Sequence, residues 1–378
     1  MVLKGITWDH PRGYEPLAAA AAAYEKKTGI RVEWQKRSLA LFGDQSIDEL
    51  SRHFDLLIVD HPHVGIMAQT NCISPMDDFI SKAEMEVLKN SSGEPSFSSY
   101  TYLKKQWALP IDAAFQAAAY RPDLISTLPV PQDWGQVFEV ADVLRKKGLK
   151  MGMALCPTDC LCSFLSLTAQ LGSPIKEENN SLVDPEIGIR ALEYLRKLRD
   201  SAHEQSLDFN PIQLYDFMCD HDDISYSPLG FCYTNYSRIG FRNKLLSFTN
   251  PPGIKNSVLG GAGISISSSS VYPKEAAGFA FWVCSGEIQC GLYVGAQGQP
   301  AHQQAWRDDQ ANRITNNFFR QCLSALQSAY IRPRYPGWPP FQQKMGEIIH
   351  GFLSNDLEVH YILQMLDSLY KDSLKGSP

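Results

Sequence analysis

LKGITWDHPRGYEPLAAAAAAYEKKTGIRVEW, residues 3–34, is the stretch that decides the fold class. Its first residues, 3–8, form an extended apolar run that predicts a strand, and apolar residues recur at helical spacing over 14–29. Two lysines followed by Gly29 predict the end of that helix, after which residues 30–34 predict a second strand. A strand, a helix and a strand in this order predict a parallel β-α-β unit with a right-handed crossover.

The same alternation continues along the rest of the chain. Further strands are predicted at 54–60, 106–120, 151–156, 224–233 and 258–267. Pro110 and Asp112 are expected to break the strand at 106–120. Further helices are predicted at 64–71, 132–148, 183–200, 272–286 and over most of 309–374. Such alternation predicts an α/β protein, in which ligands bind beyond the carboxyl ends of the strands.

Size and composition bound the class of protein. The chain has 378 residues, of which 44% are hydrophobic and 20% charged, and this predicts a globular protein of two domains. A formal net charge of −6, with no basic run near the tryptophans, argues against nucleic acid as a partner. No stretch approaches the ~18 apolar residues of a membrane span.

The cellular location stays open at this point. A strand that starts at Leu3 leaves no room for a signal peptide, so either a leader has been removed or the protein stays in the cytoplasm. Nine cysteines, an odd number, indicate no disulfide framework and favour a reducing compartment. We interpret the cluster Cys156, Cys160 and Cys162 as small buried hydrophobes, because no second pair with zinc spacing accompanies it.

A group of polar residues follows the third predicted strand. Asp60, His61 and His63 come directly after its apolar run, at the sheet edge where ligands are expected. Together with His10 they have the residue types of a zinc or iron site, and Asp60 with Asp112 has those of a glycosidase pair. The interpretation we favour is that these side chains hydrogen-bond a ligand or one another.

Four common catalytic and phosphate-binding signatures are absent from the sequence. It contains no G-x-S-x-G, H-E-x-x-H, G-x-x-x-x-G-K-[ST] or G-x-G-x-x-G motif. The run GGAGIS at 260–265 has no P-loop lysine, and we interpret it as close backbone packing. Several predicted loops are rich in aromatic and polar residues, which is typical of a cleft for a small polar molecule such as a sugar. Trp8, taken alone, is assigned to the core.

Six segments, in their order along the chain, resemble one known family. They are GYEPLAAAAAAYEKKTGIRVEW (13–34), FDLLIVDHPHVGIMAQTNCISPMDDFI (54–80), WALPIDAAFQAAAYRPDLI (107–125), PVPQDWGQVFEVADVL (129–144), GISISSSSVYPKEAAGFAFWVCS (263–285) and RPRYPGWPPFQQKMGEIIHGFLSNDLEVHYIL (332–363). Each is similar to the corresponding part of the bacterial extracellular solute-binding protein family 1, which includes the maltose-binding proteins. No single motif is diagnostic, and the resemblance depends on their order over nearly the whole chain.

The resemblance implies a fold and a function. It implies a type II periplasmic-binding-protein fold, an α/β fold whose two lobes close on a ligand by a hinge motion. Lobe I would comprise 1–111 and 262–315, and lobe II 112–261 and 316–378, with more than one crossing and no continuous sheet between them. The chain would be a monomer without cofactor or catalytic residues. It would deliver a small solute, in the first place a carbohydrate, to an ABC permease at the membrane, from the periplasm or the cell exterior.

Two alternatives remain beside this interpretation. The ligand could instead be an organic acid or another anion, paired with Arg12 and histidines. The chain could also be a cytoplasmic metal-dependent enzyme or sensor on the same fold, with Asp60, His61 and His63 as metal ligands.

Position in the family pattern also implies which residues bind the ligand. Arg12 would supply a cation after the first strand, Asp112 would lie in the hinge crossing, and Trp338 would stack on a sugar. The full implied set is His10, Arg12, Asp60, His61, His63, Asp112, Thr158, Asp159, Tyr226, Phe231, Tyr233 and Trp338.

Overall fold

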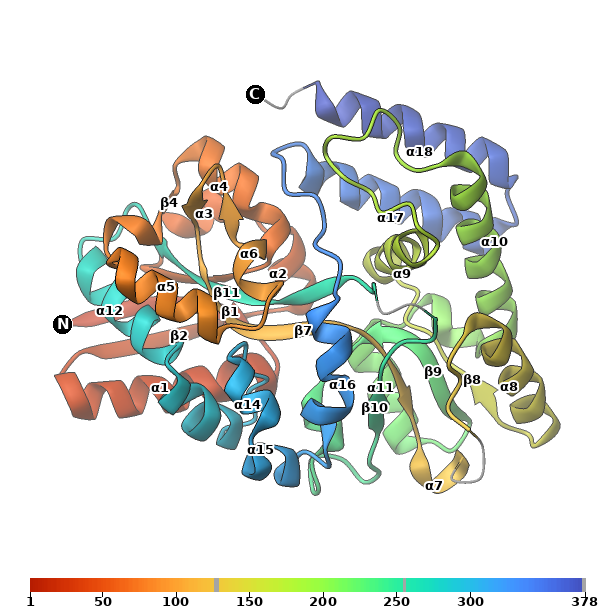
Figure 1. Cartoon of the computed structure of the whole chain (residues 1–378), viewed down its shortest axis with the longest axis horizontal. Helices are drawn as coiled ribbons and strands as arrows, with labels where there is room; N and C mark the ends of the chain where they lie inside the picture. The colour runs from red at the N-terminus through yellow and green to blue at the C-terminus, as the bar shows by residue number, and fades with distance from the viewer. Residues whose placement is uncertain (126–128, 254–255, 376–378) are drawn as a thin grey trace.

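The computed structural model describes residues 1–125, 129–253 and 256–375, and shows two lobes joined by long central strands (Figure 1). This confirms the predicted two-lobed α/β fold. Within the described ranges no helix is long and apolar enough to cross a membrane. Three short pieces of the predicted lobe II, 126–128, 254–255 and 376–378, lie outside the described residues.

The strands and helices have the following bounds. The strands are β1 (Val2–Trp8), β2 (Arg31–Arg37), β3 (Leu56–Val59), β4 (Ile73–Ser74), β5 (Thr101–Tyr102), β6 (Lys105–Gln106), β7 (Leu109–Tyr120), β8 (Lys150–Met151), β9 (Ile224–Phe231), β10 (Ser247–Thr249) and β11 (Leu259–Ser267). The first helices are α1 (Pro11–Thr28), α2 (Leu39–Asp44), α3 (Ile47–Ser51), α4 (Val64–Thr70), α5 (Lys82–Ser91), α6 (Ser96–Ser99), α7 (Pro122–Ile125), α8 (Trp134–Lys146) and α9 (Pro157–Gln170). The later ones are α10 (Pro185–Ser201), α11 (Pro211–Asp220), α12 (Pro273–Val283), α13 (Gly286–Ile288), α14 (Gln303–Arg307), α15 (Asp309–Ile314), α16 (Phe318–Gln327), α17 (Trp338–Asn355) and α18 (Val359–Leu374).

The N-terminal β-α-β unit forms as predicted. Strands β1 and β2 pair in parallel over seven residues each, which confirms the expected pairing. Helix α1 begins at Pro11, three residues before the predicted start, because the His10 side chain caps it by accepting a hydrogen bond from the Arg12 N–H at 3.0 Å. The helix ends at Gly29, whose φ of 76° is the left-handed conformation that glycine adopts readily.

Strand β7 connects the two lobes. It runs without interruption through Pro110 and Asp112, so the predicted break at these residues is wrong. Pro110 lies near the start of the strand, beside a register shift of its partner β11, where a missing N–H is tolerated. The first half of β7 pairs with β11 and its second half with β9 and β10. The order β2-β1-β3-β11-β7-β9-β8 is therefore one hydrogen-bonded path, and the expectation of no continuous sheet is wrong in this respect.

The glycine-rich run at 260–265 lies in β11, where it packs against β7. Gly261 has a φ of 102°, and a Cβ atom there would lie 2.3 Å from the Asp112 carbonyl oxygen. A Cβ atom on Gly260 would lie 2.6 Å from the ring of Phe231. Both distances are shorter than van der Waals contact, which supports the interpretation of this run as close backbone packing.

Hydrophobic packing separates the lobes only in part. One cluster draws its buried residues from 3–111 and 262–293, and another from 118–370. A further cluster combines the central strands with α14, α15 and α16, where Trp306 packs against Phe318 and Phe319. Since this cluster spans the predicted boundary at 315, the division into 1–111 with 262–315 and 112–261 with 316–378 stays a prediction.

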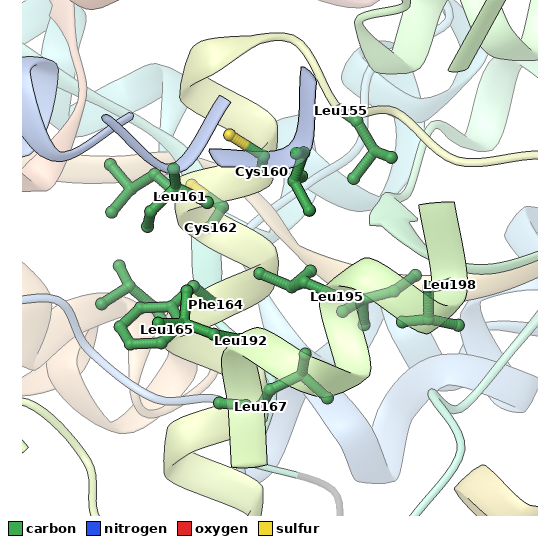
Figure 2. Packing of buried hydrophobic residues seen from close by; sticks show 14 of the residues in the cluster. Leu155, Cys160, Leu161, Cys162, Phe164, Leu165, Leu167, Leu192, Leu195 and Leu198 are labelled. Carbon is green, nitrogen blue, oxygen red and sulfur yellow. The ribbon is translucent and has the colours of Figure 1, made fainter. Parts of the chain in front are cut away.

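Helix α9 is the centre of the largest cluster. Figure 2 shows Cys160 and Cys162 on this helix beside Leu161, Phe164 and Leu165. Both cysteines are fully buried, which supports their interpretation as small hydrophobes. The strand predicted before this helix, at 151–156, is reduced to β8, because Leu155 and Cys156 instead donate hydrogen bonds to the Phe209 carbonyl.

Candidate ligand-binding site

A cavity of about 220 Å³ lies where the two lobes meet. Its volume is close to the lower end of the roughly 300–1,000 Å³ of small-molecule sites. The lining comes from the ends of β1, β3 and β9, from α2 and the first turns of α1, α9 and α11, and from the central strands. It comprises Trp8, Arg12, Leu39, Ala40, Phe42, Gly43, Asp60, Asp112, Ala114, Cys156, Thr158, Asp159, Cys162, Asn210, Pro211, Phe231, Tyr233, Gly260, Gly261, Ala262 and Arg332.

Arg12 and Asp112 form a buried ion pair on one wall. The Arg12 Nε donates to Asp112 Oδ2 at 2.8 Å, and its Nη2 donates to the other carboxylate oxygen. Its Nη1 donates to the Cys232 carbonyl at 2.8 Å, and its guanidinium lies 4.5 Å from the ring centroid of Tyr233. Burial lowers the pKa of Arg12, but the Asp112 carboxylate outweighs this and raises it. All of these contacts are within the protein, so the cation is already neutralised.

Asp60 and Arg332 form a second ion pair, in which Arg332 is buried and Asp60 is partly buried. The Asp60 side chain begins the short 3-10 helix His61–His63, where its Oδ1 accepts from the His61 N–H at 2.8 Å. Its Oδ2 accepts from Arg332 Nη2 at 2.6 Å. Burial alone would raise the pKa of Asp60, but Arg332 and His61 hold it well below the usual range. Arg332 comes from the segment before α17, so this pair ties β3 to the C-terminal part of the chain.

Asp159 has a different environment. It lies in the first turn of α9 and is 5% exposed. The Cys156 Sγ donates to its Oδ2 at 3.0 Å. Among the described residues no lysine, arginine or histidine nitrogen forms an ion pair with it, and burial raises the pKa of Asp159 to about 7.

The apolar part of the lining is aromatic. The Trp8 and Phe42 rings lie 5.2 Å apart, while Phe231 and Tyr233 come from the end of β9 and the loop after it. The Trp8 indole N–H is buried and has no acceptor within the described parts of the chain. Flat apolar faces beside a few fixed polar groups are typical of sites for small polar ligands.

The structure brings seven of the twelve implied residues to the cavity. They are Arg12, Asp60, Asp112, Thr158, Asp159, Phe231 and Tyr233. Tyr226 and Trp338 do not line it. Tyr226 is fully buried in the cluster around α9, and Trp338 packs between Tyr335 and Phe341 in the same cluster. Burial in the core leaves these two side chains no face for a ligand. The structure therefore does not support the prediction that they bind one.

The three implied histidines also lie outside the lining. His10 caps α1, with its ring 4.9 Å from that of Tyr233, while His61 and His63 are buried behind Asp60. Burial lowers the pKa of His10 to about 3 and that of His61 to about 4. In the parts of the chain that the structure describes, no three His, Cys, Asp or Glu residues are placed to hold a metal ion. The alternative of a metal site at Asp60, His61 and His63 thus has no support in the geometry.

Several lining residues were not among the implied set. Trp8 was assigned to the core, and it does pack there while one part of it reaches the cavity. Arg332 directly precedes Pro333 in the proline-rich segment that also contains Trp338, and its burial is visible only in the structure. Asn210 comes from the helix start at α11, which has no sequence feature that indicates a ligand site.

No protein-family model and no curated protein matches the sequence. The fold, however, is similar to solved structures over nearly their whole length. A maltose-bound MalE3 of T. maritima is 16% identical, with a TM-score of 0.83 and coverage of 98% of this chain and 99% of that one. An ABC transporter solute-binding protein of Agrobacterium radiobacter K84 in complex with ribitol is 18% identical, with a TM-score of 0.84 and 98% of both chains covered. One from Thermotoga lettingae TMO bound with α-D-tagatose is 17% identical, with a TM-score of 0.82 and 99% of both covered. At such identities the likeness shows the fold: this chain has the two-lobed fold of these binding proteins.

Proposed function

We propose that this chain is a solute-binding protein that captures a carbohydrate or polyol between its lobes. The observation that carries the proposal is the cavity at the junction of the lobes, where aromatic faces lie beside Asp159, Thr158 and Asn210. Sugar rings have apolar faces for such aromatic contacts and hydroxyl groups for the polar ones. The solved structures of the same fold hold maltose, ribitol and tagatose, which supports the same ligand class here.

An organic acid fits the cavity less well. Both guanidinium groups of the lining are already paired, Arg12 with Asp112 and Arg332 with Asp60. An incoming carboxylate would have to break one of these pairs and leave a buried carboxylate without its partner, which costs several kcal/mol. The carboxylate of an organic acid would also lie in the same cavity as the Asp159 carboxyl group.

We further propose that the protein acts without turnover and passes its ligand to an ABC permease, as a monomer outside the cytoplasmic membrane. Ligand binding would favour a closed arrangement of the lobes, a population shift that requires higher affinity for the closed state. Fractionation of cells that express the native gene tests the location, and co-purification with a permease tests the partner.

The ligand class is tested by a thermal-shift screen followed by calorimetric titration. A ligand that binds only the folded chain raises its melting temperature, so sugars and polyols should do so and organic acids should not. Prolonged incubation with the hit should return it chemically unchanged. Stabilisation by organic acids alone would show that the carbohydrate assignment is wrong, and conversion of the hit would show turnover.

The aromatic wall gives a matched test of the site. Phe231 is part of the cavity lining, and Phe231→Ala should weaken binding of a sugar hit about 2- to 12-fold, the equivalent of one aromatic contact. Tyr361→Ala removes an exposed aromatic ring on α18 and should leave the affinity unchanged. Equal affinities of wild type and Phe231→Ala, measured by titration, would place the ligand elsewhere.

A further inference from the structure

The charges of the cavity do not balance within the lining itself. It contains three carboxylates, Asp60, Asp112 and Asp159, and two guanidinium groups, Arg12 and Arg332. The arginines pair with Asp112 and Asp60, so Asp159 is the carboxylate that remains without an ion-pair partner among the described residues. The nearby histidines do not compensate, because burial keeps His10 and His61 neutral at pH 7.

Asp159 is held where a ligand can reach it. It lines the cavity together with Thr158 and Asn210, and its Oδ2 accepts a hydrogen bond from the Cys156 thiol. Its Oδ1 accepts no hydrogen bond from the described residues. Because a nearly buried carboxyl without a cation is costly to ionise, an ionised Asp159 is best explained by a cationic group that arrives with the ligand.

We propose that the ligand carries a protonated amino group that pairs with Asp159, as an amino sugar or an amino polyol would. This inference rests on the proposed function and specifies its ligand class. An ammonium group would restore the charge balance of the cavity and donate to Oδ1. Aromatic faces such as those of Phe231 and Trp8 attract cations as well, so the apolar wall is compatible with it.

The same pairing predicts a proton release. The charged and titratable groups that act on Asp159 are Cys156, Cys160 and Cys162 on its own helix, Tyr215 on α11, Tyr233 after β9, and Arg332. Burial raises the pKa of each thiol and phenol, and Asp60 keeps Arg332 charged, so none of them changes charge between pH 6 and 8. Asp159, with a pKa raised to about 7, does change charge there. Binding of a cation at pH 6 should therefore release a proton from Asp159.

The test compares matched pairs of ligands by calorimetric titration: glucamine against sorbitol, and glucosamine against glucose. The amino member should bind at least about tenfold more tightly, the effect of one charge-assisted hydrogen bond. Its binding enthalpy at pH 6 should depend on the buffer, as proton release requires, whereas that of the neutral member should not. Asp159→Asn keeps the side-chain shape and should abolish both the preference and the proton release, while Asp208→Asn, at an exposed position, should change neither.

The outcomes separate this inference from the proposed function. If a neutral sugar or polyol binds as tightly as its amino counterpart, the inference of an amino group on the ligand is wrong and the proposed function is unaffected. Binding of neither member of any pair overturns both. If Asp159→Asn does not give a cooperative thermal transition, the buffer dependence of the wild-type enthalpy decides, and its absence overturns the proposal.

Discussion

Asp60, which follows β3, and Asp159, in the first turn of α9, line the same cavity, the first partly buried and the second nearly buried. Arg332 lies 2.6 Å from Asp60 and holds the pKa of that carboxyl well below its usual range. Among the described residues a thiol at 3.0 Å is the one side-chain donor to Asp159, and burial raises the pKa of this carboxyl to about 7. The comparison shows that the charge state of a buried aspartate depends on its partner. Asp60 therefore connects two parts of the chain, whereas Asp159 remains available to a ligand.

The largest effect is expected from a substitution that breaks the ion pair between Asp60 and Arg332. Arg332→Met leaves a buried carboxylate without its cation and should lower the free energy of unfolding at pH 7 by about 3–5 kcal/mol. The loss should shrink as the pH falls below about 4, because the stabilisation by an aspartate with a depressed pKa is lost in that direction. Urea unfolding measures it.

The matched control for that variant is Lys371→Met, which removes one partner of the exposed pair with Asp367 and should cost about 0.5 kcal/mol or less. Adding Asp60→Asn to Arg332→Met should restore part of the stability. A loss below about 1 kcal/mol for Arg332→Met would show that the buried pair does not connect the lobes in the way described.

A smaller effect of opposite sign is expected at Asp159. Its folded-state pKa is raised, so its contribution to stability falls as the pH rises from about 4 to about 7. Asp159→Asn should accordingly raise the free energy of unfolding at pH 8, by on the order of 1–4 kcal/mol, and change it little at pH 4. Asp60→Asn, the same substitution across the cavity, should lower it at pH 7. Urea unfolding of both variants at pH 4 and pH 8 measures these changes. If both variants are less stable than the wild type at pH 8, the two aspartates do not differ in the predicted way.

The smallest expected effect concerns the thiol beside Asp159. The Cys156 hydrogen bond lowers the pKa of Asp159 against the effect of burial, so Cys156→Ala should raise that pKa further. The lost hydrogen bond should cost about 0.5–1.5 kcal/mol at pH 8, where Asp159 is ionised. Carboxyl carbon chemical shifts followed through pH 5–9 report the change, with half-buried Cys290→Ala as the control. An Asp159 titration that does not move would mean that the thiol does not donate to the carboxylate.

Features encoded by residues close together in the chain could be predicted from the sequence. The β-α-β opening, its stop at Gly29, and the caps Asp133 and Asp184 follow from periodicity and capping within a few positions. Asp60 is predicted at the ligand edge because it directly follows a predicted strand, whereas Asp112 and Asp159 are implied by the family resemblance. All three line the cavity.

The tertiary structure alone decided which of these groups are paired. Arg332 is separated from Asp60 by 272 residues, and Arg12 from Asp112 by 100. No local pattern specifies such contacts, because they depend on how the lobes pack. For the same reason Trp338 lies in the core, Trp8 reaches the cavity, and β7 continues through Pro110. The sequence by itself determined the α/β class and, to within a few residues, the bounds of α1, α4, α8, α10 and α12.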